Sequence, residues 1–516
     1  MHVVWFKRDL RLEDHAPLAA AARAGAVLPL YVVEPEWLAA PDSAGQHLGF
    51  VRECLAALKA ALRARGSELV ILSGALPEVL ARLNDWRRIT ALYSHEETGN
   101  ALTYARDRRV ADWCREHGVP WHEFPRDGVV RRLRDRDRWS AHWGERMSGA
   151  VIAPPRVLPP VDVDLAGLQR APEAGALAAL LARAPDKPQR QRGGRHEAVA
   201  LLDSFFAGRG ADYRRAMSSP LTAPTACSRL SPHFAYGTLS IREVAQRVWH
   251  ERAELHALPS PARPSGALAA LKSFEARLHW RCHFIQKLES EPDIEFRAVH
   301  AAFDDLREGR CDSVTFDAWR RGETGYPLVD ACLRYLATTG WLNFRMRAMV
   351  TSFSSHTLWN HWREPALHLA REFLDYEPGI HYPQIQMQSG VTGINAVRIY
   401  NPVKQAQDQD PQGEFVRRWL PALARVPLAY VFAPWTMPLA VQQAAGCVIG
   451  RDYPAPIVDH LVAGRAAAER IHALRRRDDV RREAQAVYVK HGSRHPAREG
   501  TRRKRAVPAN PTLPLF

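Results

Sequence analysis

Sulfur-bearing residues are few in this chain of 516 residues, and they form no recognisable site. The seven cysteines lie far apart and include no C-x-x-C pair, so neither a zinc-binding module nor a disulfide framework is indicated. They are Cys54, Cys114, Cys227, Cys282, Cys311, Cys332 and Cys447. This pattern excludes a small disulfide-stapled domain, fits a reducing compartment and predicts no metal site.

Long apolar runs are missing as well. Nowhere do about 18 apolar residues follow one another, the length that a membrane-spanning helix needs. The chain also begins with a strand-like run instead of a basic stretch followed by an apolar one. We therefore expect a protein that is neither secreted nor inserted in a membrane. Its expected location is the cytoplasm, in association with the nucleoid if the source is bacterial.

Acidic residues are outnumbered. The 71 Lys and Arg exceed the 56 Asp and Glu, which gives a formal charge of +15 and a pI near 9.8. This excess favours an anionic partner such as nucleic acid, with general solubility as the alternative. The chain is otherwise long enough for two or three domains. Its 15 tryptophans can pack, stack on flat ligands or relay electrons.

Residues 1–130 alternate apolar runs with amphipathic stretches. Runs at 2–6, 27–33, 69–72, 89–94 and 121–124 predict strands, and segments such as 46–64 and 77–83 predict helices between them. The alternation predicts an α/β domain with a parallel sheet flanked by helices. The first strand is followed by KRDLRLED, so the usual G-x-G-x-x-G dinucleotide fingerprint is missing. Here Arg8 and Asp9 are expected to pair, and Asp14 to cap the next helix.

Prolines mark the end of this domain. They cluster between residues 147 and 191, around a short helical piece at 175–183, which predicts a surface connector that we assign to 131–195. A helical period then continues almost to the end, so residues 196–475 are predicted to form a larger all-helical domain. From residue 475 onward twelve Lys and Arg face four acids, and residues 476–516 are expected to be a disordered basic tail.

Two stretches of the helical domain suit an anionic group. Residues 324–353 predict two helices broken at 338–340, and the second helix carries Arg345 and Arg347 among aromatic and sulfur-bearing neighbours. Residues 225–232 present hydroxyls and Arg229 before a helix predicted at 237–249, a setting that suits a phosphate. A plain helix cap explains those serines equally well.

Two further stretches suit a flat ligand or nucleic acid. The helix predicted at 268–288 has one apolar face and a second face that carries Arg277, Trp280 and Arg281, which suits nucleic acid or an ordinary solvated surface. Asp375 and Glu377 precede HYPQIQMQSGVTGINAVRIYNP, which we predict to be a glycine-punctuated loop of polar amides. Such groups read the edge of a heteroaromatic ring, or simply satisfy a buried loop.

Five segments, taken in order, resemble the DNA photolyase and cryptochrome family across nearly the whole chain. They are VVWFKRDLRLEDHAPL, SRLSPHFAYGTLS, LHWRCHFIQKL, GYPLVDACLRYLATTGWLNFRMR and NP-x-x-Q…GEFVRRWLP. The resemblance implies an α/β domain, a long connector and a helical domain that holds FAD folded into a U. The QMQSGVTG loop is similar to that of a photolyase-like branch in bacteria and plants.

The resemblance also implies the cofactor contacts. Arg347 and Asp375 match the arginine and acid that flank the flavin ring, and Glu377 stands where a second aspartate is usual. Cys227 stands where the family usually has threonine, which puts one hydroxyl contact in doubt. His381 aligns with the position opposite flavin N5. The implied FAD-binding set is Tyr213, Cys227, Ser228, Arg229, Leu230, Ser231, Phe274, Arg347, Asp375, Tyr376 and Glu377.

The substrate side departs from the family pattern. Arg277 stands in place of the glutamate of cyclobutane-dimer photolyases, and Phe344 in place of an asparagine, although Asn343 is adjacent. A carboxyl donor to a thymine carbonyl is therefore absent, which weakens the assignment to that lesion. The implied DNA-binding set is Arg277, Trp280, Arg281, Asn343, Phe344 and Arg345.

The family's electron route and antenna are only partly readable. Trp362 and Trp319 match the middle and outer members of its tryptophan chain, but Ile385 stands at the flavin-proximal position. With His381, these two tryptophans form the implied catalytic set, and electrons need another route, for which Trp341, Tyr382 and Tyr400 are alternatives. A second, antenna chromophore would sit in the cleft near residues 94–100. SHEETGN does not match the expected folate pattern, so that chromophore stays unidentified.

The resemblance leads to one principal function and two alternatives. We expect a monomeric, blue-light-driven DNA photolyase that acts on UV-induced pyrimidine lesions in double- or single-stranded DNA. The first alternative is a cryptochrome-like photoreceptor that binds DNA with little or no repair. The second is a flavoprotein that binds DNA without photochemistry.

Overall fold

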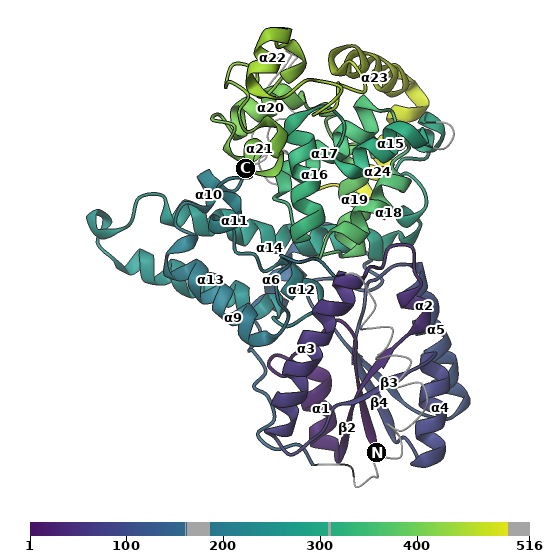
Figure 1. Ribbon diagram of the computed structural model, residues 1–516. Helices are drawn as coiled ribbons and strands as arrows, with labels where there is room; N and C mark the ends of the chain where they lie inside the picture. Colours follow the sequence, from purple (N-terminus) through teal and green to yellow (C-terminus); the bar gives the residue numbers. More distant parts are fainter. Residues whose placement is uncertain (160, 162–185, 308–310, 494–516) are drawn as a thin grey trace.

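The computed structural model describes residues 1–159, 161, 186–307 and 311–493, and it contains an α/β domain and a larger helical domain. Figure 1 shows the α/β domain below in purple and the helical domain above it in teal and green. The predicted fold class is confirmed. No helix in the described part of the chain is both long and apolar enough to cross a bilayer.

The α/β domain is built on five parallel strands in the order β3-β2-β1-β4-β5. They are β1 (His2–Phe6), β2 (Val27–Val33), β3 (Val70–Ser73), β4 (Ala91–His95) and β5 (Trp121–Phe124). The five predicted runs are thus confirmed as strands, with ends that shift by one or two residues. In the central strand His2 is in register with Val27 on one side and Ala91 on the other.

Helices cover both faces of this sheet (Figure 1). They are α1 (Ala16–Ala24), α2 (Pro35–Leu38), α3 (Gly45–Arg63), α4 (Leu76–Trp86) and α5 (Ala101–Glu116). Successive strand residues point to opposite faces. Val4 and Phe6 accordingly share a core with α1 and α3, whereas Val3 and Trp5 pack with α4 and α5. Burial on both faces is why β2 reads as a continuous apolar run.

The predicted connector contains a packed helix. Within 131–195, α6 (Trp139–Ser148) buries Trp139, Trp143 and Met147 in a core shared with α13 of the helical domain. Trp139 also donates its Nε1–H to the carbonyl of Gly128 at 3.0 Å. This part is therefore structural and is not draped over the surface. The helical piece predicted at 175–183 lies outside the described residues.

Helices make up the second domain. They are α9 (Arg195–Ser204), α10 (Tyr213–Ala216), α11 (Ala223–Ala226), α12 (Ser231–Ala235), α13 (Ile241–Ala257), α14 (Ala267–Ser290), α15 (Ser313–Arg321), α16 (Pro327–Thr339), α17 (Phe344–Ser352), α18 (Arg363–Glu372), α19 (Pro378–Gln388), α20 (Pro402–Gln409), α21 (Glu414–Trp419), α22 (Leu439–Ala445), α23 (His460–Arg476) and α24 (Asp478–His491). Two π-helical segments, η1 (Phe205–Arg209) and η5 (Phe353–Thr357), continue α9 and α17, and the 3₁₀ turns are η2 (Ser260–Ala262), η3 (Pro292–Glu295), η4 (Ala301–Leu306), η6 (Pro421–Leu423) and η7 (Pro434–Thr436).

The helix pair predicted at 324–353 is confirmed as α16 and α17. Gly340 ends α16 with φ of 70°, a left-handed conformation that glycine adopts without strain. A Cβ at this position would lie 2.5 Å from Gln46 Oε1 on α3, so the turn also touches the α/β domain. The predicted helix at 237–249 begins later, at Ile241, because Ser240 and Glu243 form a capping box.

The segment predicted as a loop after Glu377 begins as a helix, and residues 389–401 are irregular as expected. Residues 378–388 form α19 in spite of Gly379 and Pro383, which the sequence pattern treats as breakers. Gly379 allows α19 to pack closely on α14, since a Cβ there would lie 2.8 Å from the Cα of Ile285. Tertiary packing overrides local propensity here.

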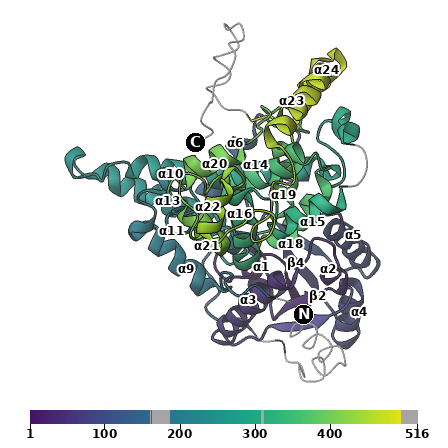
Figure 2. The same ribbon diagram turned by 45° about the horizontal axis from the view of Figure 1, so that its top comes forward.

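The first part of the predicted disordered tail is also a helix. Residues 478–491 form α24, which buries Val480 and Val487, and Figure 2 shows it extending from the helical domain on the side away from the α/β domain. His491 Nε2 lies 2.5 Å and Lys490 Nζ 2.8 Å from Glu291 Oε2 at the end of α14. This basic stretch is therefore an amphipathic helix whose apolar side packs on the helical domain.

Candidate functional site

Arg347 and Asp375 form the centre of the candidate site. Arg347 Nη2 lies 2.8 Å from Asp375 Oδ2, and its Nε donates to the carbonyl of Leu342 at 2.8 Å. The guanidinium also stacks 4.0 Å from the ring centre of Phe373. The pairing expected between α17 and the segment before α19 is confirmed. The carboxylate is 5 % exposed and the guanidinium 26 % exposed, so the pair has one open side.

Glu377 is held by arginines from three parts of the chain. Its Oε2 accepts from Arg281 of α14 at 2.8 Å and from Arg126 after β5 at 3.4 Å. Arg8, which follows β1, brings Nη1 to 3.6 Å from Oε1 and donates to the carbonyl of Tyr376 at 2.6 Å. Asp127 shares Arg281 and Arg126. The segment that carries the predicted flavin contacts is thereby tied to the α/β domain.

Three buried acceptors in this region have no hydrogen-bond partner within the described residues. They are Asp375 Oδ1, Glu377 Oε1 and Asn343 Oδ1. Unsatisfied buried acceptors are costly, so a set of them marks a place for a ligand that donates hydrogen bonds. A flavin has a ring N–H, hydroxyls on its ribityl chain and an adenine amino group, and its donors match this need.

His381 and Tyr376 are buried beside this pair. Burial lowers the pKa of His381 to about 4, so the ring is neutral near pH 7. Its Nε2 lies 2.8 Å from the carbonyl of Ala366, which fixes the proton there and leaves Nδ1 as an acceptor. Tyr376 donates its hydroxyl to Asp42 of the α/β domain at 2.6 Å. The assigned roles of His381 opposite N5 and of Tyr376 at the cofactor stay predictions.

The predicted phosphate-binding stretch is an irregular loop before α12. Arg229 adopts φ of 62°, and its guanidinium stacks 4.0 Å from the ring centre of Trp341. Arg209 donates to the carbonyls of Thr225 and Cys227, at 2.8 and 2.7 Å, which braces the loop. Burial raises the pKa of the Cys227 thiol to about 12, so it stays protonated beside an anion. Ser228 and Leu230 complete this loop, and Ser231 is the first residue of α12.

Tyr213 and Phe274 lie together in an aromatic cluster. Their ring centres are 5.9 Å apart, and Phe205 stands 4.7 Å from Phe274 and 5.7 Å from Tyr213. Both predicted cofactor residues are buried. Burial raises the pKa of Tyr213 to about 12. The cluster packs α10 against α14, and the expected role of the two rings in lining FAD stays a prediction.

The structure divides the predicted DNA-binding set. Phe344 is 37 % exposed, and Arg277, Trp280 and Arg345 are half-buried, so parts of these four side chains reach the surface. Arg281 and Asn343 make internal contacts instead. Arg281 belongs to the ion cluster around Glu377, and the Asn343 amide donates to the carbonyls of Met217 and Ser218, at 3.1 and 2.7 Å. Both side chains are thus engaged inside the protein, and their expected contact with DNA stays a prediction.

Both predicted electron-relay tryptophans lie in the core. Trp319 is completely buried and donates Nε1–H to the carbonyl of Val350 at 3.2 Å, and Trp362 is 1 % exposed. Trp319, at the outer position of the expected series of tryptophans, is therefore closed to solvent. Ile385, at the predicted proximal position, is also buried. Of the three alternatives, Trp341 and Tyr382 are buried, whereas Tyr400 is half-buried and packs against the core.

Sequence reasoning missed the residues that join the domains. Arg8 does not pair with Asp9 as expected, but with Glu377, while Asp9 contacts His15 and His95. Asp14 does not cap α1; His15 does, and Asp14 pairs with Arg242 at 2.6 Å. The neighbouring cleft near residues 94–100 is a cavity of about 70 Å³ whose lining includes Arg8, Asp42 and Glu97. No local sequence pattern predicts these long-range partners.

Comparison with known proteins identifies this arrangement. Residues 2–134 match the family model for DNA photolyase, and residues 274–473 match the model for the FAD binding domain of DNA photolyase. A deoxyribodipyrimidine photo-lyase of Streptomyces griseus is 33 % identical over 92 % of this chain and 99 % of that protein. The chain belongs to the DNA photolyase and cryptochrome family. Phe274, Arg347, Asp375 and Glu377 lie inside the matched FAD-binding domain.

Other relatives of this photolyase-family protein carry both names of the family. Cryptochrome-2 of Arabidopsis thaliana is 28 % identical over 92 % of this chain and 79 % of that protein. The crystal structure of a class III photolyase from Agrobacterium tumefaciens superimposes with a TM-score of 0.76, at 27 % identity, over 92 % of this chain and 98 % of that one. The family, its fold and its FAD cofactor are therefore shown, and relatives named photolyase and relatives named cryptochrome both match the chain.

Proposed function

We propose that this protein repairs UV-induced pyrimidine lesions in DNA in a reaction driven by blue light and dependent on FAD. The observation that carries the proposal is the Arg347–Asp375 pair beside unpartnered buried acceptors, within a domain matched to the FAD-binding domain of DNA photolyase. The 33 % identity with a photo-lyase over almost the whole chain supports it. When bound, FAD supplies light-driven transfer of one electron.

The chain's own residues would hold and tune that cofactor. Arg347 places a fixed positive charge where negative charge on a reduced ring is stabilised, and Asp375 offers Oδ1 to a ring N–H. Glu377 offers Oε1, which lies 3.6 Å from Arg8, while Arg126 and Arg281 hold its Oε2. The loop from Cys227 to Ser231 and Tyr213 would hold the phosphates and the ribityl chain.

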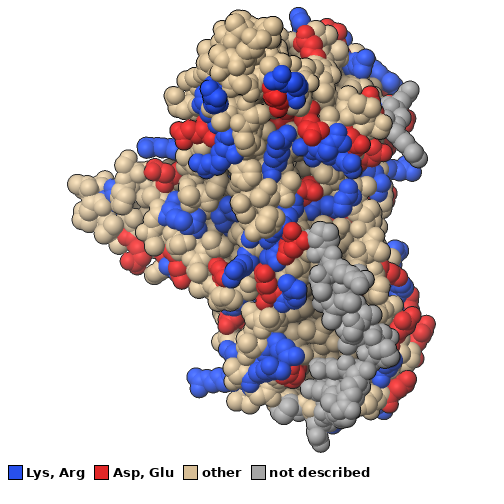
Figure 3. Space-filling model, in the orientation of Figure 1, with Lys and Arg blue, Asp and Glu red and all other residues tan. Residues whose placement is uncertain are grey.

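DNA would bind where α14 and α17 reach the surface. Arg277, Arg345 and Trp280 supply cations and an aromatic face, and exposed Phe344 adds an apolar contact. Figure 3 shows basic side chains gathered across the middle of the face drawn, with acidic side chains among them. Flipping a base out of the duplex costs roughly a few kcal/mol and costs least at a damaged, weakly stacked base, which favours lesions. We propose that the chain acts on DNA as a monomer.

A cryptochrome-like photoreceptor is the second candidate. Arg277 on the proposed substrate side and Ile385 at the predicted proximal position depart from the pattern of repair enzymes, and Arabidopsis cryptochrome-2 matches most of the chain. Such a protein would respond to light through its flavin and pass the signal to a partner, with little or no repair.

A repair assay separates the two functions. Purified, FAD-loaded and photoreduced protein is incubated with oligonucleotides that contain either a cyclobutane dimer or a (6-4) photoproduct, under blue light and in the dark. Light-dependent loss of one lesion supports the proposal. An FAD-loaded protein that leaves both lesions intact refutes it and favours the receptor. Affinity for damaged over undamaged DNA gives a second readout, since it is high for an enzyme and low for a receptor.

A further inference from the structure

A polar cavity lies where the ends of the strands meet the helical domain. β1 and β4 are neighbours at the centre of the sheet, and the connections after them run to opposite sides. In open parallel sheets this switch point leaves a crevice beyond the carboxyl ends of the strands, where ligands bind. Here it holds a cavity of about 130 Å³ whose charged lining consists of Asp14, His95, Arg126, Asp127, Arg146 and Arg242.

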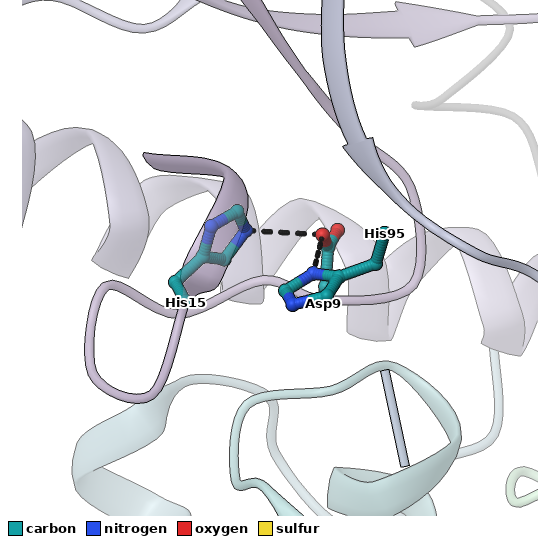
Figure 4. A group of neighbouring side chains, drawn as sticks. All are labelled: Asp9, His15 and His95. Carbon is teal, nitrogen blue, oxygen red and sulfur yellow. Dashed lines mark hydrogen bonds and ion pairs between the residues drawn. The ribbon is translucent and has the colours of Figure 1, made fainter. Parts of the chain in front are cut away.

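A buried Asp–His–His cluster forms the support behind this cavity (Figure 4). Asp9 Oδ2 lies 2.7 Å from His95 Nδ1 and 3.0 Å from His15 Nε2, and Asp9 Oδ1 accepts from the amide of Lys7 at 2.7 Å. Burial alone would raise the pKa of Asp9, but its contacts with His15 and His95 outweigh burial and hold that pKa well below its usual range. Asp9 is therefore an ionised acceptor.

These residue types also bind metals, but the hydrogen bonds of His15 argue for a different role. His15 Nδ1 accepts the amide N–H of Leu18 in the first turn of α1, at 3.1 Å. The neutral ring consequently carries its proton on Nε2, the atom that faces Asp9. A metal bound at Nε2 would displace that proton. The neutral ring would then carry its proton on Nδ1 and could no longer accept the amide N–H of Leu18 that caps α1. His15 therefore turns its Nε2 proton toward the Asp9 carboxylate, 3.0 Å away, as a close polar contact.

His95 is oriented by the same carboxylate and contributes to the cavity wall. Its Nδ1–H donates to Asp9, so Nε2 carries no proton and can accept a hydrogen bond. Burial lowers the pKa of His95 to about 3, which keeps the ring neutral at physiological pH. The wall thus presents an acceptor of fixed tautomer from the end of β4.

Arg126 contributes a buried donor to the same wall. Its side chain is 8 % exposed, and Nη1 finds no hydrogen-bond partner in the described ranges, although Nη2 reaches Asp127 and Glu377 at 3.4 Å each. The two acids of the wall are already neutralised, because Asp14 pairs with Arg242 at 2.6 Å and Asp127 with Arg281 at 3.1 Å. The lining itself holds three arginines and two acids, and two further acids lie behind it, Asp9 against His95 and Glu377 against Arg126.

We propose that this cavity binds a small oxyanion that carries a proton, of the size of inorganic phosphate. The hydroxyl of the anion donates to His95 Nε2, and one of its oxygens accepts from Arg126 Nη1. The unpartnered Nη1 of Arg126 favours an anionic oxygen as its acceptor, because charge-assisted hydrogen bonds are the stronger ones. A cavity of about 130 Å³ has room for such an ion but not for a nucleotide. Because Arg126 also reaches Glu377, occupancy is linked to the segment that carries the flavin contacts.

Titration calorimetry with inorganic phosphate and with sulfate tests this proposal on the FAD-loaded protein in phosphate-free buffer. Phosphate carries a proton at pH 7 and sulfate does not, so only phosphate satisfies His95 Nε2. We expect one phosphate site with at least tenfold weaker binding of sulfate. Equal affinities, or no binding of phosphate, would overturn the proposal.

Variants locate the site. His95→Asn and Arg126→Gln are each expected to weaken phosphate binding at least tenfold, whereas the matched control His122→Asn on β5, whose ring stacks on Tyr93 outside the cavity, retains it. Unchanged binding in both cavity variants would refute the site. If a cavity variant fails to fold, the comparison of phosphate with sulfate on the unmodified protein decides. If the purified protein contained stoichiometric zinc that the His15→Ala variant lacked, the Asp9–His15–His95 cluster would be a metal site. That result would also refute the proposed oxyanion site.

Discussion

Arg281 Nη2 lies 2.8 Å from Glu377 Oε2, which joins a residue expected to bind DNA to one expected to bind the flavin. The arginine is 10 % exposed and the carboxylate 2 % exposed, so this is an internal ion pair. Removing one member of a buried pair leaves the other charge uncompensated.

We therefore predict that Arg281→Gln and Glu377→Gln destabilise the protein by similar amounts, about 2–4 kcal/mol each, with a double variant far less harmful than their sum. Chemical denaturation of the four proteins measures this coupling. Arg277→Gln, at a half-buried position of the same helix outside this ion pair, serves as the control and is expected to change DNA affinity more than stability. Additive losses in the cycle would contradict the pairing.

Loss of the Asp375 carboxylate is predicted to weaken FAD retention at least tenfold. Asp375→Asn removes the charge that orients Arg347 while it preserves the shape of the side chain. The ratio of flavin absorbance to protein absorbance after purification, followed by FAD titration, gives the affinity. Asp408→Asn, in an exposed pair with Lys404, is the matched control. Normal flavin content in Asp375→Asn would show that the ring binds elsewhere.

Gly237 controls the approach of the two domains. It adopts φ of 69°, and a Cβ there would lie 2.2 Å from the carbonyl oxygen of Arg8 and 2.5 Å from the Cα of Asp9. We predict that Gly237→Ala costs about 2–4 kcal/mol in unfolding free energy, since both backbone strain and overlap oppose it. Gly446→Ala shares the positive φ of 66° but meets no atom within 4 Å, and about 1 kcal/mol is expected. Equal losses of unfolding free energy in the two variants would contradict a role for the close contact between Gly237 and the backbone of Arg8 and Asp9.

Docking of α24 is predicted to depend on pH. Burial would raise the pKa of Glu291, but hydrogen bonds from His491 and Lys490 outweigh it and lower that pKa to about 2. The contribution is therefore complete above the ordinary value near 4.5 and is lost as the pH falls toward 2. Glu291→Gln is expected to weaken docking by about 1–2 kcal/mol at pH 7. Hydrogen exchange of α24 measures this, with exposed Glu145→Gln as control; equal exchange in both variants would contradict it.

The tryptophan relay has a direct test. Trp362→Phe and Trp319→Phe are each predicted to slow light-driven flavin reduction at least tenfold without loss of bound FAD, because phenylalanine keeps the packing but is a poor electron donor. Flash photolysis of the purified variants measures the rate. Trp249→Phe, whose indole binds Glu275 on α14, is the control. Unchanged reduction rates in both variants would contradict this relay and favour an electron route through Trp341, Tyr382 or Tyr400.

Much of the fold follows from local patterns. The five strands, the α16–α17 pair and the long helix α14 were predictable because apolar periodicity and turn residues act within one element. The Arg347–Asp375 pair was predictable only through the family resemblance, since 28 residues separate the two side chains. Proline and glycine misled the prediction for α19, and a high arginine content did so for α24, because both helices depend on packing against other parts of the chain.

The sequence by itself determined the class of the two domains, the family, the cofactor and the positions that carry cofactor motifs. Only the tertiary structure decided which charges meet. Glu377 collects Arg8, Arg126 and Arg281 from across the chain, Asn343 turns inward, and Asp9 joins two histidines at the edge of the sheet. The physical reason is that periodicity reflects burial along one helix or strand, whereas the partner of a buried charge is set by how separate elements pack.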